Sequence, residues 1–273
     1  MIKRITDDAE RVVRYLTREG SINTTLLALI EKYGFNKDFQ EIWFQVEEDK
    51  INALIMRHFN YAYLYSWDCN CDFEELGGFV SFTGADVVLG KKGLLENILP
   101  YVDGFALEPS CHMVLENPEK LLPPYGAEKA KLEDCREMAS LIYSVPEFAR
   151  FYHSCEEIER GIRRRMEMGE IRCFVIKRDG IIVSQAYTTM ESYLYASIGG
   201  VVTRDEYRNQ GFASQVVSSI AHDILKDKKF PNLFFSNNKA GEIYKKLGFA
   251  EICEYGMLFS SKYCLNNIKN AKF

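Results

Sequence analysis

The 273-residue sequence lacks the long hydrophobic runs that membrane spans and secretion signals require. Its apolar runs fall far below the roughly 20 residues of a membrane-spanning helix. The N-terminus, MIKRITDDAERVV, has no apolar core of the kind that a signal peptide carries. We therefore expect a cytoplasmic protein with no membrane partner.

Paired metal-binding cysteines are also absent. The eight cysteines include no Cys-x-x-Cys pair, and only four histidines accompany them. Zinc binding by Cys69 and Cys71 with His58 or His112 is an alternative, but this spacing differs from that of the usual zinc knuckles. We expect reduced thiols and no bound metal.

The sequence has no excess of positive charge. Its formal net charge is −5, with 34 Lys and Arg against 39 Asp and Glu. Proteins that bind nucleic acid or anionic membranes usually have a basic balance or a basic patch, so we expect no nucleic-acid partner. The hydrophobic share of 47% is that of a soluble globular protein, and the length is sufficient for two domains.

What the sequence does contain is one pattern that occurs twice, 130 residues apart. Phe44, Asp49, Ile51, Tyr63, Leu64 and Tyr65 recur as Phe174, Asp179, Ile181, Tyr193, Leu194 and Tyr195. Both segments are typical of three strands, the first two joined by a tight polar turn at 47–50 or 177–180. An amphipathic helix with an acidic start precedes each, at 5–16 and 131–142. Such self-similarity indicates a duplicated unit.

The second copy has the clearer order of elements. A capping box at Ser154 and Glu157 begins a helix that Gly169 can close. We then expect strands at about 171–177, 181–190 and 193–203, a helix at 211–229, a strand at 232–236, a helix at 239–247 and a last strand at 250–260. This order predicts a mixed α/β (α+β) fold with a mostly antiparallel sheet flanked by helices. The proline-rich segment 116–126 predicts a linker, so we expect domains at 1–120 and 125–273.

The most specific local signal is a glycine turn between a strand and a helix. In VVTRDEYRNQGFASQVV (201–217), the strand leads into Arg208-x-x-Gly211-x-Ala213 at the start of the helix. Glycine permits a tight turn, and the small Ala213 lets a bulky group approach. The N–H groups of residues 209–214 and the helix dipole then form an anion site suited to a pyrophosphate. Taken alone, the segment is also compatible with an ordinary strand–loop–helix connection.

A second segment follows about 25 residues later and reads Asn237-x-x-Ala240-x-x-x-Tyr244-x-x-x-Gly248-Phe249. Together, over about 140 residues in the same order, the two segments resemble the GNAT superfamily of CoA-dependent N-acyltransferases. The resemblance implies a GNAT fold, duplicated in tandem, and an acyl-CoA-dependent N-acyltransferase. It implies acetyl-CoA as the acyl donor and no metal.

The resemblance also implies roles for single residues. The strand edge at 201–203 would hydrogen-bond the pantetheine as an added strand does, and a main-chain N–H of Val201 or Val202 would stabilise the oxyanion. Tyr244 would protonate the departing thiolate. The CoA-binding residues expected are Val201, Val202, Thr203, Arg208, Asn209, Gln210, Gly211, Phe212, Ala213, Ser214, Asn237, Ala240 and Tyr244.

The general base is where this sequence departs from the family. Many members carry a Glu on the strand before the pyrophosphate turn, but here that position falls on Ser197, which cannot act as a base at neutral pH. Glu191 or Glu206 could act through a water, and an amine that arrives neutral needs no base; we favour Glu191. The candidate catalytic positions are thus Tyr244, Glu191 and Ser197.

The loop at 144–155 lies between two helices, and in the family this loop usually walls the acceptor pocket. It offers Phe148, Phe151 and Tyr152 as substrate-binding candidates, with Arg150 and His153 beside them.

The first copy lacks both segments. Where its glycine turn is expected, the chain reads FTGADVVLGKKGLLENILP (82–100). We expect a degenerate GNAT-like or lid domain that closes the acceptor cleft or replaces a dimer partner. The protein would then be a monomer (a pseudo-dimer of two halves) or a homodimer.

The expected reaction is direct transfer of an acetyl group from acetyl-CoA to a primary amine of a small molecule, in a ternary complex. One alternative is a non-catalytic CoA-binding or regulatory module of the same fold. The other is an acyltransferase that uses a longer acyl-CoA or an aminoacyl donor.

Overall fold

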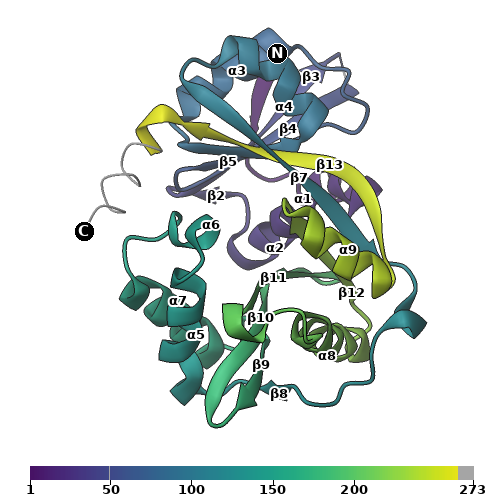
Figure 1. Ribbon diagram of the computed structural model, residues 1–273. Coiled ribbons are helices and arrows are strands. Elements are labelled where there is room, and N and C mark those ends of the chain that lie inside the picture. Colours follow the sequence, from purple (N-terminus) through teal and green to yellow (C-terminus); the bar gives the residue numbers. More distant parts are fainter. Residues whose placement is uncertain (49, 264–273) are drawn as a thin grey trace. The chain divides into compact units, whose positions relative to one another are not determined.

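The structure is a computed structural model that describes residues 1–48 and 50–263, and these form two units (Figure 1). Unit 1 contains Met1–His112 and residues 252–263, and unit 2 contains Met113–Glu251. The chain therefore leaves unit 1 within one strand and returns to it within the last one. Asp49, which we expected in the turn at 47–50, lies outside the described residues.

The elements of the first copy are β1 (Ile2–Ile5), α1 (Ala9–Leu16), α2 (Thr24–Tyr33), β2 (Asn36–Lys37), β3 (Gln40–Glu47), β4 (Lys50–His58), β5 (Tyr61–Tyr65), α3 (Phe73–Thr83), β6 (Val87–Lys91), α4 (Lys92–Ile98) and β7 (Phe105–Leu115). Those of the second copy are β8 (Glu128–Lys129), α5 (Cys135–Tyr143), α6 (Pro146–Ala149), α7 (Cys155–Glu167), β9 (Cys173–Arg178), β10 (Ile181–Glu191), β11 (Tyr195–Thr203), α8 (Phe212–Lys226), β12 (Phe230–Phe235), α9 (Asn238–Lys246) and β13 (Phe249–Ser260). Apart from the short β2 and α6, both copies have the same order of strands and helices.

Strand pairing repeats as well. β3, β4 and β5 pair antiparallel in sequence, and β5 then pairs with β6 in parallel. In the second copy β9, β10 and β11 pair antiparallel, and β11 pairs with β12 in parallel. The predicted fold class, a mostly antiparallel mixed sheet flanked by helices, is confirmed.

The last strand of each copy crosses from one unit into the other. Residues Tyr255 to Phe259 of β13 pair antiparallel with β6, so the end of the chain completes the sheet of unit 1. Conversely, Met113 and Leu115 of β7 lie in the core of unit 2. Our expectation had kept residues 252–263 with the second domain. Composition and periodicity predict that a segment is a strand, but they do not specify which strand edge it pairs with.

Helices cover both faces of the unit 2 sheet (Figure 1). On one face α8 buries an apolar stripe that includes Val217, Ile220 and Ile224. On the other face α5 and α7 bury a second cluster that includes Ile142 and Ile158. Each fully buried aliphatic side chain contributes about 1.5–3 kcal/mol to folding, so these two layers hold the sheet between them.

The predicted helix at Ser154 is confirmed as α7. The Ser154 hydroxyl accepts a hydrogen bond from the Glu157 N–H at 3.3 Å, and the Glu157 carboxylate accepts one from the N–H of His153 at 2.7 Å. Gly169 follows the helix with a φ of +67°, which suits glycine.

Candidate functional site

In unit 2, the pairing of β11 with β12 ends before either strand does. The parallel register runs from Tyr195 opposite Phe230 to Ile198 opposite Leu233. β11 nevertheless continues to Thr203, and β12 to Phe235. Within the described chain, residues 199–203 therefore have no register partner on β12. This is the strand edge that we predicted for the pantetheine chain.

Two glycines shape β11 where the pairing ends. A β-carbon at Gly200 would lie 1.9 Å from Cε1 of Tyr187, and one at Gly199 would lie 2.5 Å from Cγ2 of Thr189. Gly200 also has a φ of +56°, and the register with β10 shifts here. This local bulge redirects the backbone just before Val201, and the Tyr187 ring lies directly against it.

The loop that follows β11 is anchored and sharply turned. The Arg204 side chain donates from Nε to the Ile182 carbonyl at 2.6 Å and pairs with Glu137 at 2.9 Å. Asn209 and Gly211 then both have left-handed backbones, with φ of 62° and 82°. A β-carbon at Gly211 would meet no atom within 4 Å, so its backbone conformation, and not space, favours glycine at this position.

The N-terminus of α8 is open to an anion. Gly211 occupies the N-cap position, where no side chain accepts a hydrogen bond, and the first turn contains no acidic residue. Arg208 is exposed beside it and pairs with Asp205 at 2.7 Å. The first N–H groups of the helix and its dipole therefore present positive potential. Of the other predicted residues here, Asn209 and Gln210 are exposed, Ala213 and Ser214 are half-buried and Phe212 is buried.

Tyr244 lies on α9 between two aromatic rings. Its ring centroid is 6.1 Å from those of Phe235 and Phe249, and only 7% of the residue is exposed. Burial raises the pKa of Tyr244 to about 12, so the hydroxyl stays protonated near neutral pH. It makes no hydrogen bond to any described residue. The side chain is thus a protonated donor without a partner.

The start of α9 is fixed by the other two predicted residues and by a glycine. The side-chain oxygen of Asn237 caps the helix by accepting from the N–H of Lys239 at 2.9 Å, and Ala240 packs on the core. A β-carbon at Gly241 would lie 2.5 Å from Cε2 of Phe235, so the glycine lets α9 lie close to β12.

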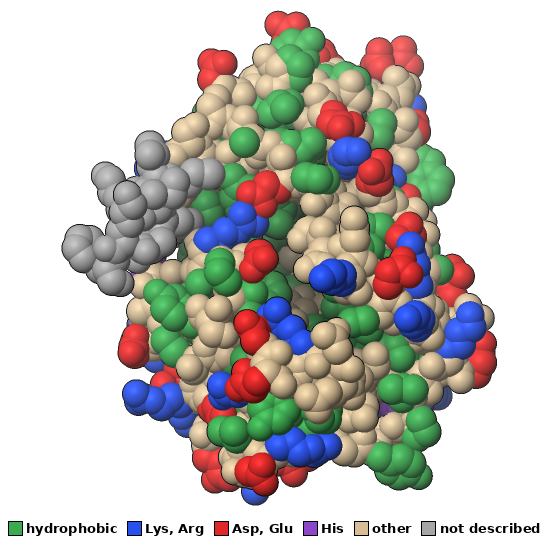
Figure 2. All heavy atoms as spheres, in the orientation of Figure 1, with side chains coloured by type: hydrophobic (Ala, Val, Ile, Leu, Met, Phe, Trp, Pro, Cys, Tyr) green, Lys and Arg blue, Asp and Glu red, His purple; other side chains and the backbone are tan. Residues whose placement is uncertain are grey.

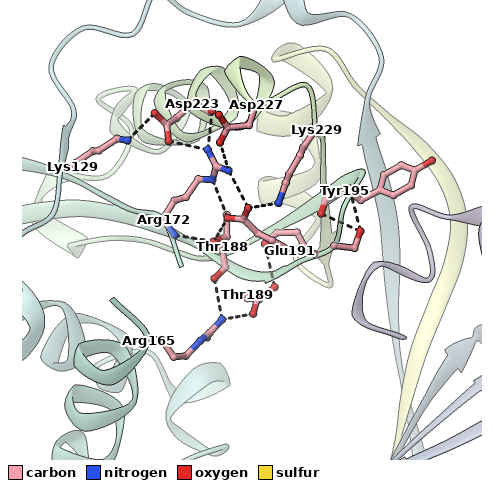
Figure 3. Close-up of polar contacts among 12 residues, drawn as sticks. Lys129, Arg165, Arg172, Thr188, Thr189, Glu191, Tyr195, Asp223, Asp227 and Lys229 are labelled. Carbon is pink, nitrogen blue, oxygen red and sulfur yellow. Dashed lines mark hydrogen bonds and ion pairs between the residues drawn. The ribbon is translucent and has the colours of Figure 1, made fainter. Parts of the chain in front are cut away.

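Glu191, the predicted base, has all of its acceptor positions occupied (Figure 3). One carboxylate oxygen accepts from Nε of Arg172 and from the Thr188 hydroxyl, both at 2.9 Å. The other accepts from Nη2 of Arg172 and from Lys229, both at 3.0 Å. Burial would raise the pKa of Glu191, but the hydrogen bonds from Arg172 and Lys229 hold it below its ordinary value. A carboxylate with four donors and a lowered pKa has little capacity to take a proton from a substrate, so the geometry favours a structural role.

Arg172 extends this cluster to α8. It pairs with Asp223 at 3.1 Å and with Asp227 at 2.7 Å, and Lys129 pairs with Asp223 at 3.0 Å (Figure 3). The contacts join residues from β8, β10, α8 and the segment before β9. We did not predict this cluster, because its members are far apart in the sequence and follow no recognisable spacing.

The other two candidates for the base position offer no better proton acceptor. Ser197 is 3% exposed on β11, and its main-chain carbonyl accepts from the Thr189 hydroxyl at 3.2 Å. Glu206 is exposed in the turn after β11.

Among the predicted substrate-binding residues, Tyr152 is the one that contacts the bulge region. Phe148 and Tyr152 are half-buried against the cluster under α5 and α7. The Tyr152 hydroxyl hydrogen-bonds with that of Tyr187, whose ring lies on Gly200. The ring of Phe151 is covered by the Arg150 guanidinium at 4.9 Å.

In unit 1, the helix N-terminus that corresponds to that of α8 belongs to α3. The connecting loop is residues 66–72, and not 82–100 as expected, because β5 is five residues long whereas β11 is nine. Asp72 caps α3 by accepting from the N–H of Glu75 at 2.9 Å, and Glu74 also lies in the first turn. These carboxylates satisfy the helix and repel an anion.

The described chain shows no other site of similar kind. No group of three or more His, Cys, Asp or Glu side chains among residues 1–48 and 50–263 is placed to hold a metal ion. No helix within those ranges is long and apolar enough to cross a membrane. Basic and acidic side chains are interspersed on the face that Figure 2 shows.

Comparison with known proteins places this architecture among acetyltransferases. Residues 178–257 match the family model described as "FR47-like protein". An acetyltransferase from the GNAT family of Colwellia psychrerythraea is 15% identical, with 95% of this chain and 99% of that chain covered and a TM-score of 0.57. A GCN5-related N-acetyltransferase from Sphaerobacter thermophilus is 15% identical, with 94% of each chain covered and a TM-score of 0.63.

A third solved structure bears on the duplication. A tandem GNAT protein from the clavulanic acid biosynthesis pathway is 9% identical, with 96% of this chain and 98% of that chain covered and a TM-score of 0.56. Identities this low establish the fold alone. A search of curated protein sequences finds no match.

Proposed function

This chain belongs to the GNAT superfamily by its fold and its FR47-like segment, and on that premise we propose that unit 2 is an acyl-CoA-dependent N-acyltransferase. Its donor would be acetyl-CoA and its acceptor a primary amine of a small molecule. The observation that carries the proposal is the uncapped N-terminus of α8, which follows the unpaired edge of β11 in the same unit.

The donor would be held mainly by main-chain groups. The N–H groups at the start of α8, with residues 208–214 around them, would bind the pyrophosphate, and hydrogen bonds to a charged group are each worth about 1.5–3 kcal/mol. The edge at 201–203 would bind the pantetheine amides. Asn237 and Ala240 would border the donor from α9. We propose that unit 1 does not bind CoA in this way, because Asp72 and its neighbouring carboxylates occupy the corresponding helix start.

The chemistry follows from three groups. The amine nitrogen would attack the thioester carbonyl carbon, and the N–H of Val201 or Val202 would stabilise the resulting oxyanion. As the carbon–sulfur bond breaks, the sulfur would take a proton from the Tyr244 hydroxyl. Tyr244 would regain that proton from solvent, and the nitrogen would lose one to solvent. The products are an N-acetyl amine and CoA thiol.

The acceptor amine would arrive neutral. Glu191 has its four acceptor positions filled, and Ser197 is not a base at neutral pH, so neither supports proton removal. An amine that is already neutral at the site needs no carboxylate.

Ligand-induced stabilisation tests the donor site. A ligand at 100 times its Kd stabilises the native state by about 2.7 kcal/mol, which raises the Tm by several degrees. We expect acetyl-CoA and CoA to raise the Tm. Gly211→Asp, which copies the acidic cap of Asp72, should abolish most of this shift.

Gly169→Asp is the matched control. Gly169 also has a left-handed backbone, and a β-carbon there also meets no atom within 4 Å, but it lies at the far end of α7. Both variants should lose similar intrinsic stability, and only Gly211→Asp should lose the response to CoA. If no CoA species shifts the Tm of the unmodified protein, both the enzyme and a non-catalytic CoA module are excluded.

The buried position of Tyr244 favours one competing function. A tyrosine packed between Phe235 and Phe249 could serve the core alone, and unit 2 would then be a non-catalytic CoA-binding module. Release of free thiol from acetyl-CoA in the presence of amines distinguishes the two.

A further inference from the structure

Arg165 is a half-buried arginine that has no carboxylate partner in the described chain. It lies in the last turn of α7, and its guanidinium reaches the end of β10 (Figure 3). There it donates to the main-chain carbonyls of Thr188 and Thr189. Arg172, by contrast, pairs with three carboxylates. The charge of Arg165 is therefore left uncompensated by the residues that the structure describes.

The surroundings of Arg165 are polar and belong to the proposed acceptor side of unit 2. Burial raises the pKa of Tyr152 and of Tyr187, and the positive charge of Arg165 opposes the increase in both, so the guanidinium lies near both hydroxyls. These two hydroxyls hydrogen-bond with each other. The Tyr187 ring lies against Gly200, the residue before Val201. One polar group thus connects Arg165 to the bulge where the acyl carbonyl would be held.

Gln185 adds a second unpartnered polar group on the same side of the sheet. It is fully buried, and neither atom of its amide has a hydrogen-bond partner in the described chain. Its register partners, Val175 and Val202, belong to the same core cluster as Tyr187. A buried amide without a partner costs about 1–3 kcal/mol, so this face has polar capacity beyond what the protein itself satisfies.

The spacing along β10 sets the size of the molecule that could use these groups. Tyr187 pairs with Gly199 across the strands, and Thr189, which Arg165 contacts, lies two residues further on. Two residues of a strand span about 7 Å. A molecule of amino-acid size can place its amine near the bulge and a carboxylate near Arg165 over that distance.

We propose that Arg165 binds the carboxylate of the acceptor, and that the acceptor is an amino acid or another small amine with a carboxylate. The inference rests on the proposed N-acyltransferase function. A guanidinium matches a carboxylate through two parallel hydrogen bonds, and a half-buried charge gains most from such a partner. The Tyr152 hydroxyl is placed to add a further hydrogen bond.

The test compares acceptors that differ only in the carboxylate. The panel is the common amino acids, their amides and their decarboxylated amines, with free-thiol release from acetyl-CoA as the assay. For the unmodified protein, kcat/KM should be at least tenfold higher for the preferred amino acid than for its amide. Arg165→Gln keeps a donor for the β10 carbonyls but removes the charge, and it should bring this ratio to about one, mainly through KM. Arg165→Lys should retain an intermediate preference.

Arg164→Gln is the matched control, because Arg164 is exposed one position away on the same helix. It should leave the ratio unchanged. If Arg165 only holds the carbonyls of β10, Arg165→Gln will leave the ratio intact, and the inference is overturned. Equal use of acids and amides by a protein that acetyl-CoA stabilises overturns the inference alone. Absence of both stabilisation and acetylation overturns the proposed function with it.

Discussion

Replacing Glu191 by Gln separates a structural role from a catalytic one. The substitution keeps the shape of the side chain but removes its charge, and it places an NH2 group among the donors of Arg172, Lys229 and Thr188. The side chains of Glu191 and Arg172 are only 14% and 17% exposed. Breaking a buried ion pair costs about 3–5 kcal/mol, and partial exposure reduces that to about 2–4 kcal/mol here. For a chain of this size the Tm should fall by about 6–12 °C.

The assay is thermal unfolding of Glu191→Gln beside Asp227→Asn. Asp227 contacts the same guanidinium, but its side chain is 58% exposed, so its loss should cost no more than about 1 kcal/mol. Turnover of Glu191→Gln, measured well below its Tm, should fall by less than the roughly 10²-fold that loss of a general base costs. An unchanged Tm with a 10²-fold loss of turnover would refute the structural role.

The pH dependence of stability provides an independent check on Glu191. Its pKa is lowered in the folded state, so the stabilisation that it gives is complete above its ordinary value near 4.5 and is lost as the pH falls through the lowered value. The difference in unfolding free energy between the unmodified protein and Glu191→Gln should therefore be constant above about pH 5 and shrink at lower pH.

Two further predictions concern the reaction. Tyr244→Phe keeps the ring between Phe235 and Phe249 and removes a hydroxyl that has no described partner, so the Tm and the acetyl-CoA-induced shift should hardly change while turnover falls at least about tenfold. Tyr193→Phe, which alters an 80% exposed tyrosine, is its control, and an equal effect of the two would assign Tyr244 to packing. If the acceptor arrives neutral, kcat/KM should rise about tenfold per pH unit up to the pKa of the amine and should shift with that pKa across a series of amines. A rise that stays at one pH for every amine would instead identify an enzyme group as the base.

The order of elements in unit 2 could be predicted from the sequence because its local signals are strong. Val217, Ile220 and Ile224 recur at helical spacing, and all three are fully buried under α8. The capping pattern at Ser154 gave the start of α7 to within a residue. The 130-residue offset revealed the duplication, because matched strands repeat the same alternation of side chains.

The features that could not be predicted depend on contacts between distant residues. The four donors on Glu191 come from residues spread over positions 172–229, so an exposed turn and an ion-pair cluster look alike in the sequence. The single offset misplaced the first-copy helix, because the strand before it is shorter than its counterpart. That Arg165 lacks a counterion is a statement about three-dimensional neighbours, and only the structure could show it.

The exchange of β7 and β13 limits how this gene could have evolved and how it can be dissected. Each structural half draws a strand from the other half of the coding sequence, so a truncation at the proline-rich segment would not yield an intact domain on either side. After such an exchange became fixed, the half that lost its glycine turn could no longer be deleted without removing strand partners from the half that kept it. An inactive copy is then retained because it completes the fold of the other, whether or not it ever meets a substrate.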